Sequence, residues 1–532
     1  MNVRARRPVT PSPRSIRHDA RRVRASLAVL AVFAACTTPA TAPATAPRAS
    51  LEIATEQGVV VGRARDGVRE FVGIPYAAPP VGALRWRPPV PAAAWTAPRD
   101  ATHRGPACPQ PEEGYHRDTS EDCLNLNVWV PDGAAGKLPV LVWIHGGAFY
   151  QGSGGDDLYD GARLARRTRA IVVSINYRLG PLGFLSQRAL AREQGRDALP
   201  AVGLLDQRAA LQWVQRNIAA FGGDPARVTL DGASAGAWSE CAQLAMPGSR
   251  GLFARAILQS GACSDALYFT AEAANAQGDE LAAKVGCTGD DVAACLRGKS
   301  ADVLAAALPF RRGLLLLPGV WWGPIVDGVE LPRVPLAAIR AGDFARVPLI
   351  LGTARDEGTL HTLAYDAVSP DELAWFVRGV FGDAAVAPVV ARYARATPKA
   401  ALTDIVTEGI FRCNTRRVAR LVAARGVPVY LYQWTHALES PPKVHALGPT
   451  HGVDLFFLFG ATSLGIGPSA AELPLVDLIE DLWGQFARSG DPGHGWPRYT
   501  SAGDQHLVLD TQPMTGAHLD QQICDFWDAL SP

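Results

Sequence analysis

Short apolar segments alternate with longer amphipathic segments along most of this chain. The apolar segments are rich in Val, Ile and Leu and have the length of buried strands. They cover residues 138–144, 170–177, 227–230, 254–258, 347–351 and 427–432. Helical periodicity is strongest over residues 203–221, where two glycines follow as a stop signal, and over residues 474–488. The alternation predicts an α/β fold with a large, mostly parallel central sheet and helices on both faces.

The composition is that of a folded globular protein, with 48% hydrophobic and 19% charged residues. It excludes a disordered or fibrous chain. The 52 basic and 51 acidic residues are unevenly distributed, because residues 1–36 alone hold eight Arg and one Asp. The remainder, with 44 basic and 50 acidic residues, is mildly acidic and has no basic stripe. We therefore expect no nucleic-acid partner.

The first 36 residues have the features of a signal peptide. An Arg-rich stretch precedes an apolar run of about ten residues over 26–35, whereas a helix that spans a bilayer needs roughly 20. We therefore expect no transmembrane span. The run ends at Cys36, and residues 33–36 resemble a bacterial lipoprotein box, although Phe33 is unusual at its first position. The sequence thus leaves two possibilities, a lipid anchor at Cys36 or ordinary cleavage at a small-residue site.

Residues 37–50 are a Pro-, Ala- and Thr-rich tether that cannot pack a core, and residues 51–532 are expected to form one domain. The predicted location is outside the cytoplasm: the bacterial periplasm, the cell envelope or the medium. The eight cysteines after Cys36 agree with export, because an even number in an exported chain suggests disulfides. The sequence has no Cys-x-x-Cys motif and no tight His/Cys cluster, so it gives no indication of a zinc site.

The strongest chemical signal is the segment Gly232-Ala233-Ser234-Ala235-Gly236, which lies between a predicted strand and a predicted helix. A sharp strand-to-helix turn needs small neighbours, and it exposes the serine hydroxyl beside a helix N-terminus. A serine nucleophile also needs donors for an oxyanion. Residues 145–149, His-Gly-Gly-Ala-Phe, follow an earlier strand and have the small residues that such donors require.

Several further blocks occur in a fixed order around this segment. They are residues 71–77, 121–128, 176–180, 203–211 and 221–225. With these blocks, the chain from about residue 58 to residue 528 resembles the type-B carboxylesterases, the cholinesterase-like branch of the α/β-hydrolase superfamily. The resemblance implies an α/β-hydrolase fold and a Ser-His-Glu catalytic triad.

The resemblance also assigns the partners of Ser234. His451 lies in a block similar to the histidine loop of the family, whereas His436 and His445 lack that flanking pattern. Glu357 occupies the position of the acid, and Asp356 is the rival if the register slips by one residue. The oxyanion donors are expected to be the backbone N–H groups of Gly147, Ala148 and Ala235. Ser260 resembles a serine that helps to seat the acid, and an ordinary serine at a strand end is the alternative.

Two features depart from the family pattern. Many relatives carry Glu immediately before the serine, where this chain has Ala233, so the hydrogen-bond network through that carboxylate is absent or rebuilt. The loop between Cys108 and Cys123 holds Tyr115 but no Trp, whereas cholinesterases place a Trp there to face a quaternary ammonium group. Trp321, Trp322 and Phe310 are other candidate pocket aromatics, although core packing is the commoner use of each.

The resemblance implies a disulfide between Cys108 and Cys123 and another between Cys413 and Cys524. Cys287 and Cys295 enclose seven residues and are expected to pair, which leaves Cys241 with Cys263.

The expected activity is hydrolysis of carboxylic esters of small, uncharged alcohols through an acyl-enzyme, with no metal or organic cofactor. The alternatives are a lipase, a hydrolase of carbamates or cyclic esters, and a non-catalytic cholinesterase-like binding protein. Proteins of the last kind typically lose the serine or the histidine, and both are present here.

Overall fold

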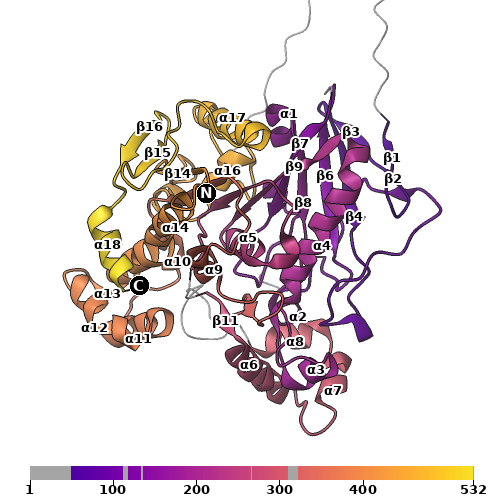
Figure 1. The fold of residues 1–532 in the computed structure, drawn as a ribbon, viewed down its shortest axis with the longest axis horizontal. Helices are drawn as coiled ribbons and strands as arrows, with labels where there is room; N and C mark the ends of the chain where they lie inside the picture. Colours follow the sequence, from indigo (N-terminus) through magenta and orange to yellow (C-terminus); the bar gives the residue numbers. More distant parts are fainter. Residues whose placement is uncertain (1–49, 112–117, 134–135, 265–266, 309–320, 531–532) are drawn as a thin grey trace, which may run out of the picture. The chain divides into compact units, whose positions relative to one another are not determined.

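The computed structural model describes residues 50–111, 118–133, 136–264, 267–308 and 321–530 (Figure 1). One compact unit spans Ala49–Pro532. The expected signal peptide with Cys36 and all of the tether except Ser50 lie outside the described residues, as do Tyr115 and Phe310.

The main sheet has eleven strands within the described part of the chain. In spatial order they are β16 (Met514–Ala517), β15 (Gln505–Leu509), β14 (Val429–Trp434), β13 (Leu349–Ala354), β10 (Arg255–Gln259), β9 (Gly223–Ala233), β7 (Leu138–Ile144), β8 (Ile171–Ile175), β6 (Asn125–Pro131), β4 (Val68–Pro75) and β3 (Arg63–Arg65). Pairing is parallel from β15 through β14, β13, β10, β9 and β7 to β8, and antiparallel at both ends. The parallel strands therefore end at one edge of the sheet, where ligand sites of α/β folds lie.

Apolar runs dominate the central strands β7 and β8 because both faces of the sheet are covered. Successive side chains of a strand point to opposite faces. In β7, Val140, Val142 and Ile144 belong to the core on one face, and Leu141 and Trp143 belong to the core on the other. This arrangement explains why the sequence shows continuous apolar runs there rather than alternation.

Helices from distant parts of the chain cover the two faces (Figure 1). One face carries α2 (Gly180–Phe184), α4 (Val202–Asn217), α5 (Ala235–Ala245), α9 (Pro335–Ala341) and α14 (Cys413–Ala423). The other carries α1 (Ala162–Thr168), α16 (Asp454–Leu458) and α17 (Leu473–Ser489). The helix predicted over 203–221 ends earlier, at Asn217, and continues as a short 3-10 turn to Phe221.

The described chain contains further helices and small strands. The helices are α3 (Arg188–Glu193), α6 (Ala271–Lys284), α7 (Val292–Gly298), α8 (Ala301–Ala307), α10 (Gly358–His361), α11 (Pro370–Phe381), α12 (Asp383–Arg392), α13 (Pro398–Ile405), α15 (Pro442–His445) and α18 (Gln521–Ala529), with a π-helical segment at Val406–Arg412. The short strands β1 (Glu52–Ala54), β2 (Val59–Val61) and β5 (Arg99–Asp100) form one small sheet, and β11 (Phe269–Thr270) pairs with β12 (Ile325–Val326). No helix among the described residues has the length and apolarity that a membrane span needs.

Three of the blocks that the sequence singled out, residues 121–128, 176–180 and 203–211, supply charged residues to buried or partly buried ion pairs. Arg178, after β8, donates two hydrogen bonds of 2.7 Å to the carboxylate of Asp206 in α4, and both side chains are buried. Arg85 binds Glu121, and its guanidinium also donates to backbone carbonyls at the end of α7. A buried charge is expensive unless it is paired and hydrogen-bonded. These pairs therefore hold the long connections around the sheet in one arrangement.

Four disulfides lie within the described part of the chain: Cys108–Cys123, Cys241–Cys263, Cys287–Cys295 and Cys413–Cys524. These are the four expected pairs. The last one joins α14 to the C-terminal helix α18, and ion pairs from Arg416 and Arg417 to Asp525 and Asp528 run beside it.

We predict that the Cys413–Cys524 disulfide stabilises the fold more than Cys287–Cys295 does. The two bridges span 111 and 8 residues, and a bridge that closes a longer loop removes more entropy from the unfolded chain. Replacing both cysteines by Ser should cost about 2 kcal/mol more for the long bridge than for the short one. Thermal or urea unfolding of the two double variants measures the difference, and an equal or larger loss from the short bridge would contradict it.

Candidate active site

Ser234 lies in a strained turn between β9 and α5. Its φ of 57° and ψ of −122° are sparsely populated by L-residues, and such conformations cluster at functional sites. Its backbone N–H donates to the carbonyl oxygen of Gln259, at the end of β10, over 2.9 Å. The turn thus places the serine at the edge where the parallel strands end, at the start of a helix, as the sequence predicted.

The two glycines beside the serine are required by close packing. A Cβ atom at Gly236 would clash with the carbonyl oxygen of Ile144, the last residue of β7. A Cβ atom at Gly232 would lie 2.8 Å from the Glu240 carboxylate and 2.9 Å from the same Ile144 oxygen. The spacing of the motif therefore reflects how tightly the turn packs against the neighbouring strand.

The loop after β7 reaches the serine directly. A Cβ atom at Gly146 would lie only 3.2 Å from the Cβ atom of Ser234. Gly147 and Ala148 have positive φ values of 102° and 55°, and their N–H groups donate to no other described residue. Both residues line the cavity that contains Ser234. Ala235 is the first residue of α5, where backbone N–H groups have no partner within the helix.

The predicted acid and base are joined by a hydrogen bond. His451 Nδ1 lies 2.5 Å from Oε2 of Glu357, and the other carboxylate oxygen of Glu357 accepts the Ala354 N–H over 2.7 Å. Glu357 is fully buried and His451 is 9% exposed. Asp356, the rival acid, instead pairs with Arg355 toward solvent. The geometry therefore favours Glu357 and leaves the Nε2 side of the imidazole for the cavity.

The acid loop and the histidine loop are bound to each other. Asp356 and Thr450 form a parallel bridge, and the Asp356 N–H donates to the carbonyl oxygen of Pro449 over 3.0 Å. The Thr359 hydroxyl contacts the Thr450 hydroxyl at 2.7 Å and the Leu447 carbonyl oxygen at 2.8 Å. These contacts hold Glu357 and His451 in register across 94 residues of sequence.

Sequence reasoning missed two rings that pack against His451. His361, in α10, lies 4.7 Å from the His451 ring, and Phe411, in the π-helical segment, lies 4.9 Å from it. His361 also stacks on Phe411, and neither of its ring nitrogens has a hydrogen-bond partner among the described residues. Burial, and then His451, lower the pKa of His361 well below its usual value, so it is neutral beside the imidazole. One sequence signal was available for His361. It lies four residues after Glu357, and residues four apart share a helix face.

Ser260 does not make the expected contact with the acid. Its N–H donates to the Gly352 carbonyl oxygen of β13 over 2.8 Å, but its buried hydroxyl has no hydrogen-bond partner among the described residues. The neighbouring Gly261 approaches the serine turn, and a Cβ atom there would lie 2.5 Å from the Ser234 carbonyl oxygen. The end of β10 therefore positions the turn through its backbone.

Three buried carboxyl groups lie close to the turn and the acid–base pair: Asp231, Glu240 and Asp454. Burial raises the pKa of Asp231 and of Glu240 well above the usual range. Burial, and then the nearby charge of Glu357, raise the pKa of Asp454 to about 6. Asp454 accepts a hydrogen bond of 3.2 Å from the Tyr432 hydroxyl. Ala233 rather than a glutamate precedes Ser234, but these three other buried carboxyl groups lie close to the site.

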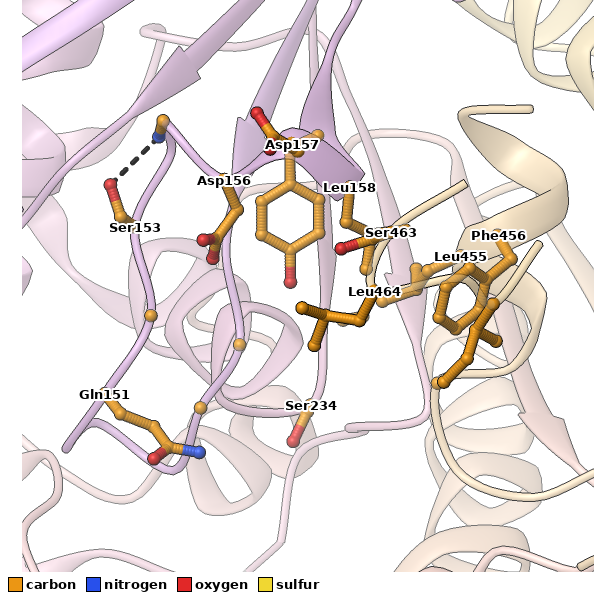
Figure 2. Close-up of a pocket in the computed structure, with 18 of the residues that line it drawn as sticks. Gln151, Ser153, Asp156, Asp157, Leu158, Ser234, Leu455, Phe456, Ser463 and Leu464 are labelled. Carbon is orange, nitrogen blue, oxygen red and sulfur yellow. Dashed lines mark hydrogen bonds between the residues drawn. The ribbon is translucent and has the colours of Figure 1, made fainter. Parts of the chain in front are cut away.

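A cavity of about 860 Å³ opens over the turn (Figure 2). Ser234, His451, Gly147 and Ala148 all line it. Its described aromatic lining residues are Tyr159 and Phe456. Trp322 is instead buried in the core and Trp321 packs on Phe269, so neither candidate tryptophan lines the described cavity. No group of three or more His, Cys, Asp or Glu residues in the described ranges could hold a metal ion.

Fold and site together define an α/β-hydrolase. The family model described as "Carboxylesterase family" matches residues 49–379 and 381–527. The acetylcholinesterase of Bungarus fasciatus is 36% identical over an alignment of 536 positions, which covers 91% of this chain and 86% of that protein. The para-nitrobenzyl esterase of Bacillus subtilis (strain 168) is also 36% identical, over 86% of this chain and 95% of that protein.

Solved structures agree with the sequence matches. A PNB esterase superposes with a TM-score of 0.79 at 34% identity, covering 90% of this chain and all of that one. A thermophilic PNB esterase gives a TM-score of 0.80 at 32% identity with the same coverage. The chain belongs to the carboxylesterase family, whose members are serine hydrolases of the α/β-hydrolase fold.

We predict that Gly236→Ala disrupts the site and destabilises the fold. The added methyl group would collide with the Ile144 carbonyl oxygen, and overpacking of this kind typically costs about 1–3 kcal/mol. Gly298→Ala is the control, because Gly298 ends α7 and a Cβ atom there meets nothing within 4 Å. Thermal unfolding of both variants checks the prediction, which fails if the two lose equal stability.

We predict a pH-dependent stability effect from Asp454→Asn. The unfolded carboxyl titrates near 3.8 and the native one near 6, so the native state holds an extra proton between these values. Native stability therefore falls as pH rises from about 4 to 6, and the loss remains in full above that range. The neutral Asn side chain escapes this loss, so the stability of the variant relative to the parent should rise by about 2 kcal/mol between pH 4 and pH 7. Urea unfolding across this range measures the trend; a constant difference contradicts it.

Proposed function

We propose that the chain is an exported serine carboxylesterase that hydrolyses carboxylic esters of small, uncharged alcohols with Ser234, His451 and Glu357 as its triad. The observation that carries this proposal is the 2.5 Å contact between His451 Nδ1 and the fully buried Glu357, beside the cavity that Ser234 also lines. The order nucleophile, acid, base along the chain is that of the α/β-hydrolases.

The proposed reaction begins with attack of the Ser234 hydroxyl on the ester carbonyl carbon. His451 Nε2 takes the hydroxyl proton and then gives it to the leaving alcohol oxygen. Glu357 keeps the imidazole in the tautomer with its proton on Nδ1 and stabilises the imidazolium that forms. Water then attacks the acyl-enzyme, with His451 again acting as base, and the carboxylic acid is released.

The oxyanion of each tetrahedral intermediate is proposed to bind the N–H groups of Gly147, Ala148 and Ala235. Support comes from the close approach of Gly146 to Ser234 and from the N–H groups of Gly147 and Ala148, which donate to no backbone carbonyl among the described residues. Backbone donors fixed before the reaction stabilise the developing charge without reorganisation. Removing one such donor typically costs about 10²–10³ in turnover.

The export part of the proposal rests on the N-terminal sequence and on the disulfides. The Arg-rich stretch, the short apolar run and Cys36 favour a signal peptide with a possible lipid anchor. The described part of the chain contains four disulfides. Disulfides persist in oxidising compartments and are rare in reducing ones. The mature protein would then act in the periplasm, on the cell envelope or in the medium.

We predict that a fluorophosphonate probe labels Ser234 and that Ser234→Ala abolishes both labelling and hydrolysis. The strained turn places Ser234 at the cavity, beside the helix N-terminus and the proposed oxyanion donors. The loss in turnover should be about a thousandfold or more, with the melting temperature preserved. Peptide mass spectrometry locates the adduct, and an adduct on a different serine would overturn the assignment.

We predict no strong preference for choline esters. The described aromatic lining of the cavity is limited to Tyr159 and Phe456, whereas a quaternary ammonium site is best built on Trp. Asp156 and Asp157 also line the cavity, but exposed carboxylates are screened over roughly 8 Å in physiological salt. The ratio of kcat/KM for a choline ester and its uncharged carbon isostere should stay below about 30, which corresponds to about 2 kcal/mol. A larger ratio would refute the expectation.

A further inference from the structure

Leu464 occupies an unfavourable position for a leucine on two counts. Its side chain is 78% exposed, and its φ of 53° lies in the left-handed region that L-residues other than Asn and Asp avoid. It stands at the tip of a hairpin closed by bonds of 2.8 and 2.9 Å between Ser463 and Ile466, with Gly465 as its second central residue. Such turns favour Asn-Gly at these two places. A residue that is both strained and exposed calls for a functional reason.

The hairpin tip lies at the mouth of the cavity. Leu464 is one of its lining residues, and Figure 2 shows its side chain reaching into the space above Ser234. Leu455 and Phe456, from α16, line the same side, as do Leu447 and Val444 before the histidine loop. Gln151, Ser153 and Asp156 line the side opposite Leu464 in Figure 2. The side of the cavity around Leu464 is therefore mainly apolar, although Ser463 lies on it, and the opposite side carries polar groups.

The chemistry decides which part of an ester meets the apolar wall. His451 must give its proton to the leaving alcohol oxygen, so that oxygen lies on the His451 side of Ser234. His451 belongs to the same chain segment as the apolar wall, between Leu447 and Leu455. The alcohol group of the substrate consequently extends along leucines and Phe456, whereas the acyl group is directed away from them.

We infer that the cavity selects esters of bulky apolar alcohols, with Leu464 as the specificity-determining residue that covers the alcohol group. This inference rests on the proposed function and narrows its small, uncharged alcohols to those that carry a bulky apolar group, such as benzyl alcohol. An aryl or branched alkyl group in this position would bury the exposed leucine and remove apolar surface from water. A methyl group is too small to reach the hairpin tip and gains little from it.

The test uses two esters with the same acyl group, benzyl acetate and methyl acetate. Both give the same acetyl-enzyme, so only the acylation step differs between them and kcat/KM reports it. We expect the parent to prefer benzyl acetate by more than about tenfold. Leu464→Asn and Leu464→Gly should each lower the benzyl-to-methyl ratio of kcat/KM by about tenfold. Leu464→Met, which retains an apolar side chain, should keep the ratio within about threefold.

Stability measurements and one control separate specificity from unfolding. Asn and Gly both suit a left-handed turn position, so neither substitution should lower the melting temperature. Leu363→Asn is the matched control, since Leu363 is a leucine of similar exposure, 58%, that does not line the cavity. It should leave the ratio unchanged.

An unchanged ratio in Leu464→Asn and Leu464→Gly would overturn the inference while leaving the esterase proposal intact. An equal fall of the ratio in Leu363→Asn, or a parent that does not prefer benzyl acetate, would overturn it as well. Hydrolysis of neither ester would also refute it, and fluorophosphonate labelling of Ser234 in the same sample shows whether the proposed function falls with it.

Discussion

The close packing of the Ser234 turn against the end of β7 is the constraint on which the rest of the site depends. The Ile144 carbonyl oxygen occupies the space where a side chain of residue 236 would be, and it limits residue 232 as well. The same strand end leads into Gly146, which approaches Ser234 itself. Ser234 and the loop after β7 are thus placed by one contact between adjacent parallel strands, and this contact would be lost if the strands moved apart.

Glu357 and His451, the proposed acid and base, depend on a second contact of the same kind, between the loops that follow β13 and β14. The bridge from Asp356 to Thr450 and the hydroxyl of Thr359 fix the spacing of the two loops, and the hydrogen bond from His451 to Glu357 follows from it. His361 and Phe411 then cover the imidazole, which excludes water from that side of the ring. Their burial strengthens the electrostatic interaction between the imidazole and the carboxylate.

Buried carboxyl groups without hydrogen-bond partners among the described residues lower the stability of the fold near the site. Glu240 is fully buried with neither oxygen hydrogen-bonded among the described residues, and Asp454 has one oxygen in the same state. Unsatisfied buried carboxyl groups destabilise a fold unless they take up a proton, which agrees with their raised pKa values. The large two-faced core and four disulfides offset this cost elsewhere in the molecule.

The sequence by itself determined the features that arise from neighbouring residues. Apolar runs of strand length predicted the central sheet, and the glycines around Ser234 predicted a sharp turn, because periodicity and local sterics are written in consecutive positions. Only the tertiary structure set the Glu357 carboxylate against His451 while Asp356 pairs with Arg355, brought His361 and Phe411 against the same imidazole, and gave the cavity a mainly apolar side and a polar side. These outcomes join segments that are far apart in sequence, so they follow from strand order and loop packing rather than from any local pattern.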